Sequence, residues 1–281
     1  MVWQLGTVPY LNADPLAAAL REPDAALLVG DAVDLQALIP AELLPRLLAG
    51  DLDAALVSTA GVLPHEELRI LPVGCVSSRG PVRSIILYCT KPVAEIRTVA
   101  LDASSRSAVA LTRVLFAERW RLSPEFVTLP PDLPLMLERA DAALLIGNPA
   151  LQASARLARQ EWVGPPVECL DLGEIWDDLT RLPFVYAIWG SPVQRGGDAV
   201  DHARLTRALC RARDWGLKRR GILASRGSDS LHLPYDVCRD YLTHAIRYDL
   251  GRDERAGIQR FCELAVKHGV LPPTAAVRFA E

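Results

Sequence analysis

Short apolar runs alternate along the chain with longer runs in which apolar residues recur every three or four positions. The short runs predict buried strands and the longer ones predict amphipathic helices. The predicted strands are 2–8, 26–29, 54–57, 70–76, 84–89, 98–101, 126–129 and 142–146. The predicted helices are 43–48, 107–120, 133–139, 149–159, 198–218, 235–248 and 253–267. This alternation predicts mostly parallel sheets with helices on both faces.

Two extended apolar stretches, 84–92 and 182–192, interrupt this rhythm, and each ends at a proline. They predict a pair of strands that leave one domain and return to it. The resulting layout is a discontinuous first lobe, residues 1–88 plus 191–281, and an inserted second lobe, residues 89–190. Two lobes joined by two crossover strands predict an α/β, two-lobed periplasmic-binding-protein-like (type II) fold, with the ligand in the cleft between the lobes.

The composition restricts what the chain can bind. Half of its 281 residues are hydrophobic, the net charge is −3 and the basic residues are dispersed, so we expect substantial cores and no nucleic-acid partner. The six cysteines lack metal-ligand spacing, so we expect free thiols and no metal. No export signal and no apolar run of about 20 residues is visible, which predicts a cytoplasmic protein without a membrane partner. The sequence leaves the oligomeric state open.

The first predicted strand continues into a polar turn that contains Tyr10, Asn12 and Asp14, and Pro15 then opens an apolar helical run. Polar side chains between a strand and a helix are common ligand contacts in α/β proteins. The Asn12 amide can donate to and accept from a ligand at once, although Asn also caps helices well. Asp14 directly precedes the proline and is the better cap, which leaves Asn12 free to face the cleft. Tyr10 can line the cleft or pack in the core.

Hydroxyl side chains follow two other predicted strands. Ser58 and Thr59 end strand 54–57, where they can cap the next helix or bind a carboxylate. The segment after strand 98–101 places further candidates at the start of a long helix: Ser104, Ser105, Arg106 and Ser107. The helix dipole and free N–H groups favour an anion there, and Arg106 can add a bidentate carboxylate contact. The alternative is a serine-rich cap beside a solvated arginine.

Two later segments supply further candidates. Gly147 and Asn148 follow strand 142–146; Gly147 would let the backbone approach a ligand, whereas Asn148 suits a ligand contact and a helix cap equally. The acidic segment 171–180 is interpreted as a solvated turn anchored by Trp176, which can also line the cleft.

No histidine forms a nucleophile–base pair, and no phosphate-loop, dinucleotide or serine-hydrolase motif is present.

Four segments carry a family resemblance: VPYLNADPL (8–16), PAELLPRLLAGDLDAALVST (40–59), LLIGNPAL (144–151) and DLGEIWDDLTRLPFVYAIW (171–189). In this order they resemble the chorismate dehydratases of the futalosine route to menaquinone. That family usually has Asp where this chain has Asn148 and Gly where it has Arg181. The resemblance implies a carbon–oxygen lyase that eliminates water from chorismate to give 3-[(1-carboxyvinyl)oxy]benzoate, without a cofactor.

Chorismate carries two carboxylates, and the resemblance implies that the cleft holds both. We expect Ser58 and Thr59 to bind one and the helix start from Ser104 to Ser107 to bind the other, with Asn12 as the catalytic residue at the reacting ring. The remaining expected substrate contacts are Tyr10, Ser84, Gly147, Asn148 and Trp176. No strong protein base is evident, so a substrate carboxylate can accept the proton itself. Two alternatives stay open: a 1,4-dihydroxy-6-naphthoate synthase-like enzyme of the same pathway, and a solute-binding protein without catalysis.

Overall fold

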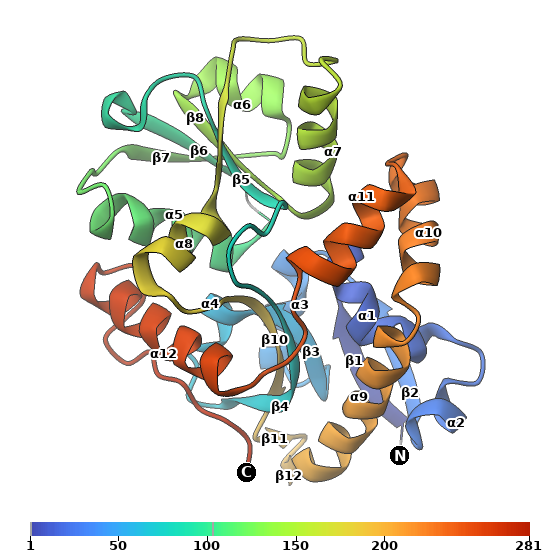
Figure 1. Cartoon of the computed structure of the whole chain (residues 1–281). Helices are drawn as coiled ribbons and strands as arrows, with labels where there is room; N and C mark the ends of the chain where they lie inside the picture. Colours follow the sequence, from blue (N-terminus) through green and yellow to red (C-terminus); the bar gives the residue numbers. More distant parts are fainter. Residues whose placement is uncertain (1, 103) are drawn as a thin grey trace.

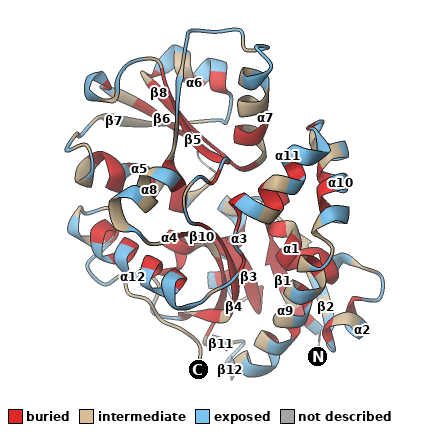
Figure 2. Cartoon of the chain, viewed as in Figure 1, coloured by how far each residue is buried: buried red, intermediate tan, exposed pale blue. Residues whose placement is uncertain are grey.

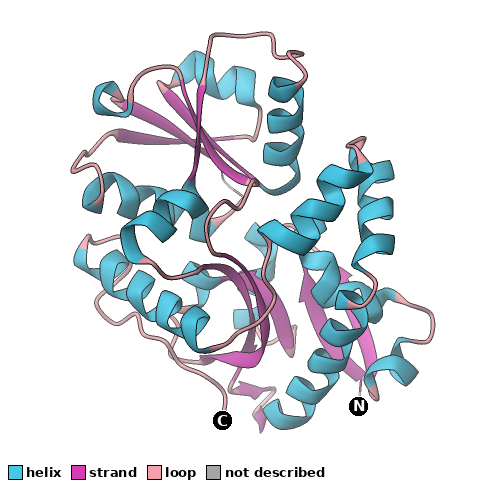
Figure 3. Cartoon of the chain, in the orientation of Figure 1, coloured by secondary structure: helices cyan, strands magenta, loops and turns pink. Residues whose placement is uncertain are grey.

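The computed structural model describes residues 2–102 and 104–281, which form two lobes around two five-stranded sheets (Figures 1 and 3). The first sheet has the order β2-β1-β3-β10-β4, and the second has the order β7-β6-β8-β5-β9. The strands of the first sheet are β1 (Val2–Thr7), β2 (Ala32–Ala37), β3 (Ala54–Ser58), β4 (Leu68–Ser78) and β10 (Phe184–Pro192). Those of the second are β5 (Ile85–Cys89), β6 (Thr98–Asp102), β7 (Glu125–Leu129), β8 (Ala142–Ile146) and β9 (Glu168–Asp171).

Helices surround both sheets (Figure 3). The first lobe carries η1 (Leu11–Ala13), α1 (Asp14–Ala17), η2 (Ala18–Arg21), α2 (Ala25–Val29), α3 (Pro40–Leu48), α4 (Thr59–Val62), α9 (His202–Leu217), α10 (Arg220–Leu231), α11 (Tyr235–Asp240), η4 (Tyr241–Ala245) and α12 (Arg252–Lys267). The second lobe carries η3 (Val93–Glu95), α5 (Arg106–Glu118), α6 (Leu133–Arg139), α7 (Gly147–Ala158) and α8 (Leu172–Thr180). A short hairpin joins β11 (Gln194–Arg195) to β12 (Asp198–Ala199). Within the described part of the chain, no helix is long and apolar enough to span a bilayer.

Both sheets are mixed, where mostly parallel sheets were expected. β1 pairs in parallel with β2 and β3, and β6 pairs in parallel with β7 and β8. β10 is antiparallel to β3 and β4, and β5 is antiparallel to β8 and β9. β5 and β10 are the strands that arrive from the other lobe, so no crossover helix within their own sheet sets their direction.

The sheet pairing also moves the expected lobe boundaries. Residues 85–88, expected in the first lobe, belong to β5 of the second sheet, and residues 184–190, expected in the second lobe, belong to β10 of the first sheet. The chain passes between the lobes at 79–84 and 181–183. An extended apolar segment has the same sequence pattern whether it joins two lobes or lies inside one sheet, so the pattern alone placed the crossings wrongly.

Several local predictions were wrong for identifiable reasons. Residues 26–29, expected as a strand, belong to helix α2, which Gly30 ends in a left-handed conformation at φ 82°. An apolar run of four residues does not distinguish the two structures. Segment 171–180, expected as a turn, contains helix α8, because Asp171 caps it by accepting hydrogen bonds from the backbone of Gly173 and Glu174. The elements missed entirely include β2, β9, β11, η3 and α10. The helix expected from residue 198 begins at His202, because 198–199 pair in the hairpin.

The buried residues gather on the sheets and on the helix faces toward them (Figure 2). α9 packs closely on the helical segment after β1: a Cβ atom on Gly216 would overlap the carbonyl oxygen of Pro15. This close approach fixes the backbone that follows the turn with Tyr10 and Asn12, and it therefore fixes one wall of the cleft described below.

Candidate functional site

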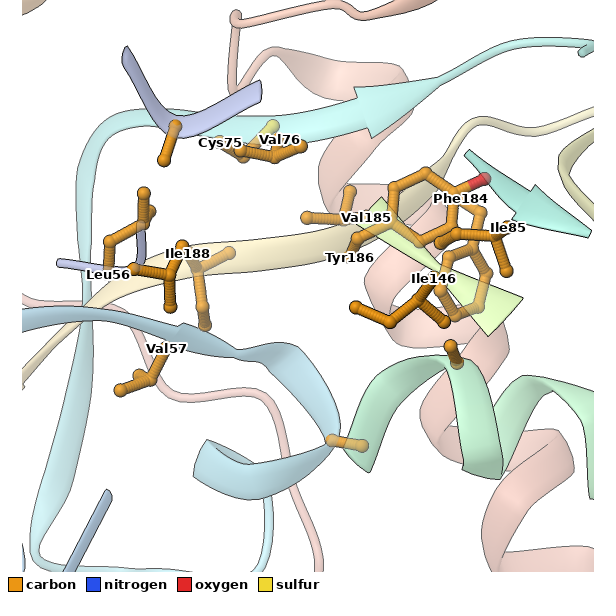
Figure 4. Packing of buried hydrophobic residues seen from close by; sticks show 14 of the residues in the cluster. Leu56, Val57, Cys75, Val76, Ile85, Ile146, Phe184, Val185, Tyr186 and Ile188 are labelled. Atoms are coloured by element: carbon orange, nitrogen blue, oxygen red, sulfur yellow. The ribbon is translucent and has the colours of Figure 1, made fainter. Parts of the chain in front are cut away.

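A cleft of about 530 Å³, measured with its open mouth, lies between the lobes at the ends of β1, β3, β6 and β8. Its polar lining consists of Tyr10, Asn12, Ser58, Ser104, Ser105 and Tyr186. Its apolar walls include Val8, Leu56 and Val76 from the first lobe, and Ile85 and Ile146 from the second. Figure 4 shows Ile85 and Ile146 beside the Tyr186 ring. The cleft therefore offers an apolar space with hydroxyl and amide groups in its lining.

A second hollow, of about 450 Å³, adjoins the cleft. It shares Pro40, Ser58 and Ser104 with the cleft, and Arg106 lines it as well. Arg106 is the first residue of α5, so its cationic group lies beside the helix N-terminus. The expected cation and helix start are thus brought together next to the cleft, where both favour a negative charge.

The turn after β1 places the Asn12 side chain in the cleft by a different route from the one expected. Asp14 makes no cap; it is the first residue of α1 and pairs with Arg21 at 2.6 Å. Burial raises the pKa of Asp14, and Arg21 opposes that shift. Asn12 lies in the 3₁₀ turn η1, where its side chain caps no helix and lines the cleft.

Asn148 is not the cap of α7, which begins one residue earlier at Gly147. Its Oδ1 accepts a hydrogen bond from the Leu11 N–H at 3.1 Å, and its Nδ2 donates to the Pro9 carbonyl at 3.4 Å. Asn148 thus ties the second lobe to the turn of the first lobe on both sides of Tyr10. An aspartate, usual in the similar family, could accept from Leu11 but could not donate to Pro9.

Gly147 lines the cleft in a left-handed conformation, at φ 59°. A Cβ atom there would lie 3.3 Å from the Tyr10 ring, so glycine lets the ring pack directly on the α7 backbone. Tyr10 is half-buried and lines the cleft, which decides between the two alternatives left open by the sequence.

The hydroxyl groups near α5 are divided between the cleft and the protein. Ser107 is fully buried, and its Oγ lies 2.7 Å from Ser58 Oγ and accepts from the Ala60 N–H at 3.1 Å. Ser107 therefore supports Ser58, which lines the cleft, and does not line it itself. The Thr59 hydroxyl is buried without a hydrogen-bond partner among the described residues, and Thr59 lines neither hollow.

Ser104 and Ser105 line the cleft while they hold the start of α5. Ser105 Oγ caps the helix by accepting from the Ala108 N–H at 3.2 Å. Ser104 Oγ donates to Asp102 Oδ1 at 2.6 Å, and Asp102 Oδ2 accepts from the Ile146 N–H at 3.3 Å. Burial raises the pKa of Asp102, and these hydrogen bonds oppose the shift. Asp102 was not predicted, although an Asp two residues before a serine at a strand end is typical of such a turn.

Ser84 and Trp176, like Thr59, Ser107 and Asn148, do not line the cleft. Ser84 is 1% exposed; its Oγ accepts from the Tyr241 hydroxyl at 2.7 Å and its carbonyl accepts from the Gly147 N–H at 2.7 Å. Trp176 is fully buried and packs edge-on against Phe184 and Phe261, at centroid distances of 5.1 and 6.3 Å. The placement of Trp176 in the cleft was therefore wrong, because its segment forms helix α8 with the indole on the inner face.

Two tyrosines near the site were missed. Tyr186 of β10 lines the cleft, and its hydroxyl lies 2.9 Å from Ser78 Oγ. Tyr241 lies in η4, and its hydroxyl donates to Ser84 Oγ. The only sequence signal for Tyr186 was a single phenol within the apolar run 184–190. No pattern near residue 241 indicates a contact with residue 84, because the two are distant in sequence.

The lining itself holds few ionisable groups. No His, Asp or Glu of residues 2–102 and 104–281 lines the cleft. The same residues contain no group of three or more His, Cys, Asp or Glu side chains placed to hold a metal ion. What the arrangement can do chemically is orient an anionic, ring-shaped ligand with neutral donors and acceptors, beside a helix N-terminus and Arg106.

Comparisons with known proteins identify the family to which the chain belongs. The family model described as "Menaquinone biosynthesis" matches residues 3–267. The chain is 33% identical over 268 residues to a chorismate dehydratase of Thermus thermophilus, covering 92% of this chain and 93% of that protein. These findings confirm the family resemblance inferred from the four segments.

Solved structures agree on the fold. A protein from Archaeoglobus fulgidus superposes with a TM-score of 0.70 at 14% identity, over 96% of this chain and 98% of that one. The alkanesulfonate-binding protein of Xanthomonas axonopodis pv. citri superposes with a TM-score of 0.68 at 17% identity, over 98% and 96%. A Candida albicans protein with the generic periplasmic binding protein fold has a TM-score of 0.68 at 11% identity, over 97% and 91%. The chain is thus a two-lobed α/β protein of the periplasmic-binding-protein-like fold and belongs to the menaquinone biosynthesis family.

Proposed function

We propose that the protein is a chorismate dehydratase, a hydro-lyase that converts chorismate to 3-[(1-carboxyvinyl)oxy]benzoate and water. The observation that carries this proposal is the 33% identity, over nearly the whole length of both chains, to a protein with that activity. The cleft supports it, because its apolar walls suit a six-membered ring and its edges suit anionic groups.

The N-terminus of helix α5 binds part of the substrate. One carboxylate of chorismate lies at the N-terminus of α5, where Ser104, Ser105 and free backbone N–H groups meet the charge of Arg106. The other carboxylate is held near Ser58, whose hydroxyl Ser107 supports. Carboxylates accept hydrogen bonds from hydroxyls and backbone N–H groups, and such charge-assisted bonds are stronger than neutral ones. Thr59 and Ser84 lie behind these groups and support the walls.

The chemical step is an elimination. The ring carbon that bears the enolpyruvyl ether loses a proton, and the electrons of that C–H bond form a new double bond. The neighbouring carbon loses its hydroxyl, which leaves as water after it gains a proton. Because no carboxylate or imidazole of the described residues lines the cleft, a carboxylate of the substrate itself accepts the ring proton.

Asn12 acts at the reacting ring. Its amide carries a donor and an acceptor, so it can hold the departing hydroxyl while the charge on that oxygen changes. The apolar walls exclude water, which strengthens these contacts. Aromatisation drives the reaction, so the protein has only to orient the substrate and ease the departure of the proton and the hydroxyl.

The proposal is tested by incubating the purified protein with chorismate and following the loss of the diene absorbance. We expect a product with the mass of chorismate less one water. A tight complex that returns chorismate unchanged would support the solute-binding alternative. Absence of both turnover and binding, with turnover of a cyclic futalosine-derived substrate, would support the naphthoate synthase alternative.

A further inference from the structure

The first crossing between the lobes, residues 79–84, adjoins the cleft lining at both of its ends. Just before it, Ser78 Oγ lies 2.9 Å from the hydroxyl of Tyr186, which lines the cleft. At its end, the Ser84 carbonyl accepts a hydrogen bond at 2.7 Å from the N–H of Gly147, which also lines the cleft. The path of this crossing therefore affects where two parts of the lining lie.

The Asp171 carboxylate holds the end of this crossing. Its Oδ1 accepts a hydrogen bond from the Val82 N–H at 3.0 Å, and its Oδ2 accepts one from the Arg83 N–H at 2.6 Å. Arg83 has a left-handed backbone conformation, φ 63°, which is unfavourable for residues other than glycine. The bond to Asp171 therefore stabilises a conformation that an arginine seldom adopts.

The same carboxylate begins helix α8. Its Oδ1 also accepts hydrogen bonds from the N–H groups of Gly173 and Glu174, at 2.9 and 3.2 Å. The start of α8 packs closely on the residues before the crossing: a Cβ atom on Gly173 would lie 2.7 Å from both Ser78 Oγ and the Tyr186 hydroxyl. Asp171 thus joins the first crossing to a helix that lies directly against a residue of the cleft lining.

The other end of α8 meets the second crossing. Arg181, the residue after α8, begins that crossing, and its carbonyl accepts a hydrogen bond from Arg79 Nη2 at 3.3 Å. Arg79 belongs to the first crossing, and it also pairs with Asp253 of α12 at 3.1 Å. The two crossings are therefore connected at both ends of α8, by Asp171 at its start and by Arg79 at its end.

We propose that Asp171 is a positioning residue that joins the first crossing between the lobes to the start of α8 and so keeps the two walls of the cleft in the arrangement that the reaction requires. Asp171 does not line the cleft, so it acts through the crossing and not on the substrate. The inference rests on the proposed function, because it takes this cleft as the place where chorismate reacts.

Asp171→Asn separates the bond to the crossing from the helix cap. Asparagine caps helices about as well as aspartate, and three of the four bonds go to Oδ1, so the asparagine oxygen should keep that position. Its Nδ2 group then faces the Arg83 N–H, donor against donor, and that bond is lost. The variant should lower kcat on chorismate about tenfold and change KM less than about threefold, since misalignment of the two walls costs turnover more than binding.

Asp132→Asn is the matched control. Asp132 likewise caps a helix of the second lobe, α6, through the Leu135 N–H at 3.1 Å, and it lies outside both crossings. This variant should retain the parent kcat, whereas a parent kcat in Asp171→Asn would overturn the proposal. If Asp171→Asn does not fold, Asp171→Ser takes its place: serine also caps helices, but its side chain is too short to reach the crossing as well.

Glycine at position 83 distinguishes this role from a general loss of structure. Glycine adopts a left-handed backbone without steric cost, so Arg83→Gly should restore the kcat of Asp171→Asn to within about threefold of the parent. Gln160→Gly changes another left-handed position of the second lobe, at φ 58°, and should restore nothing. A loss of kcat that Arg83→Gly leaves unchanged would assign the effect to α8 alone and overturn the proposal.

Hydrogen exchange, measured by NMR, gives a readout independent of turnover. The Arg83 amide should exchange with water at least about tenfold faster in Asp171→Asn than in the parent or in Asp132→Asn. Equal exchange in all three would overturn the proposal whether or not chorismate turns over. If the protein binds chorismate but leaves it unchanged, the same loss and rescue in the affinity for chorismate would support the positioning role and remove the proposed function.

Discussion

The two walls of the cleft are built in different ways. On the second lobe, the start of α5 is held by neighbours in sequence: Ser105 caps the helix and Ser104 bonds to Asp102. On the first lobe, the turn with Asn12 is held by Asn148, which lies more than a hundred residues away in the chain. The locally built wall offers charge and helix N–H groups, and the remotely built wall offers one amide, that of Asn12. Under the proposed function, substrate binding depends mainly on the local wall, and the chemical step depends on the wall that contacts distant in sequence hold in place.

The largest effect should come from removing the amide itself. Asn12→Ala should lower kcat about 100- to 1,000-fold, as the loss of a group that stabilises a transition state does. The variant should unfold at a urea concentration close to that of the parent, because Asn12 is only partly buried and caps no helix. Full retained activity, measured by product formation, would remove Asn12 from the mechanism.

The next effect tests the charge on the opposite wall. Arg106→Gln should raise KM for chorismate about 10- to 100-fold, because a hydrogen bond to a charged group contributes about 1.5–3 kcal/mol. The effect on kcat should be smaller, since this contact forms before the reaction. Arg119→Gln, an exposed arginine at the other end of α5, is the matched control and should leave KM unchanged. Equal KM values for the two variants would show that Arg106 does not bind the substrate.

A smaller effect should follow from releasing the turn from the second lobe. Asn148→Ala removes both bonds to the turn, to Leu11 and to Pro9, and should lower kcat about tenfold through displacement of Asn12. Gln152→Ala is the control: Gln152 lies on the same helix and also bonds across the lobes, to the Leu231 carbonyl at 3.0 Å, but does not touch the turn. If both variants lose activity equally, general contact between the lobes is responsible and the placement of the turn is not.

Loss of the helix cap on the local wall should also lower the stability of the protein. Ser105→Ala removes the cap of α5 and should lower the free energy of unfolding by about 0.5–2 kcal/mol, measured by urea denaturation. Ser123→Ala, in the exposed segment after α5, should change it by less than about 0.5 kcal/mol. An unchanged stability in Ser105→Ala would show that α5 does not depend on this cap.

The smallest effect is expected at the far end of α5, where Glu118 bonds to Lys267 at 2.7 Å and to His268 at 2.6 Å. These partners lower the pKa of Glu118, so the folded state favours the carboxylate. Its stabilising contribution is therefore present above the unfolded-state pKa and is lost as the pH falls through the lowered folded-state pKa. Glu118→Gln should lower stability at pH 7 by less than about 1 kcal/mol, and the difference from the parent should vanish in acid. A difference that persists in acid would assign the effect to packing.

The sequence by itself determined the features that depend on nearby residues. The strand ends predicted at 57, 101 and 146 and the helix start predicted at 107 lie within one residue of those in the structure. They and the two-lobed α/β class follow from periodicity and cap chemistry, which act over a few residues. The resemblance to chorismate dehydratases followed from four short segments, and it is confirmed.

Only the tertiary structure decided which of these polar groups face the cleft. It placed Trp176 in the core, Ser107 behind Ser58 and Asn148 against the turn, and it brought Tyr241 to Ser84. It also assigned β5 and β10 to the sheets of the opposite lobes from those expected. The physical reason is that sequence patterns encode burial and local hydrogen bonding, whereas a contact across more than a hundred residues depends on how whole elements pack, and no local pattern records that.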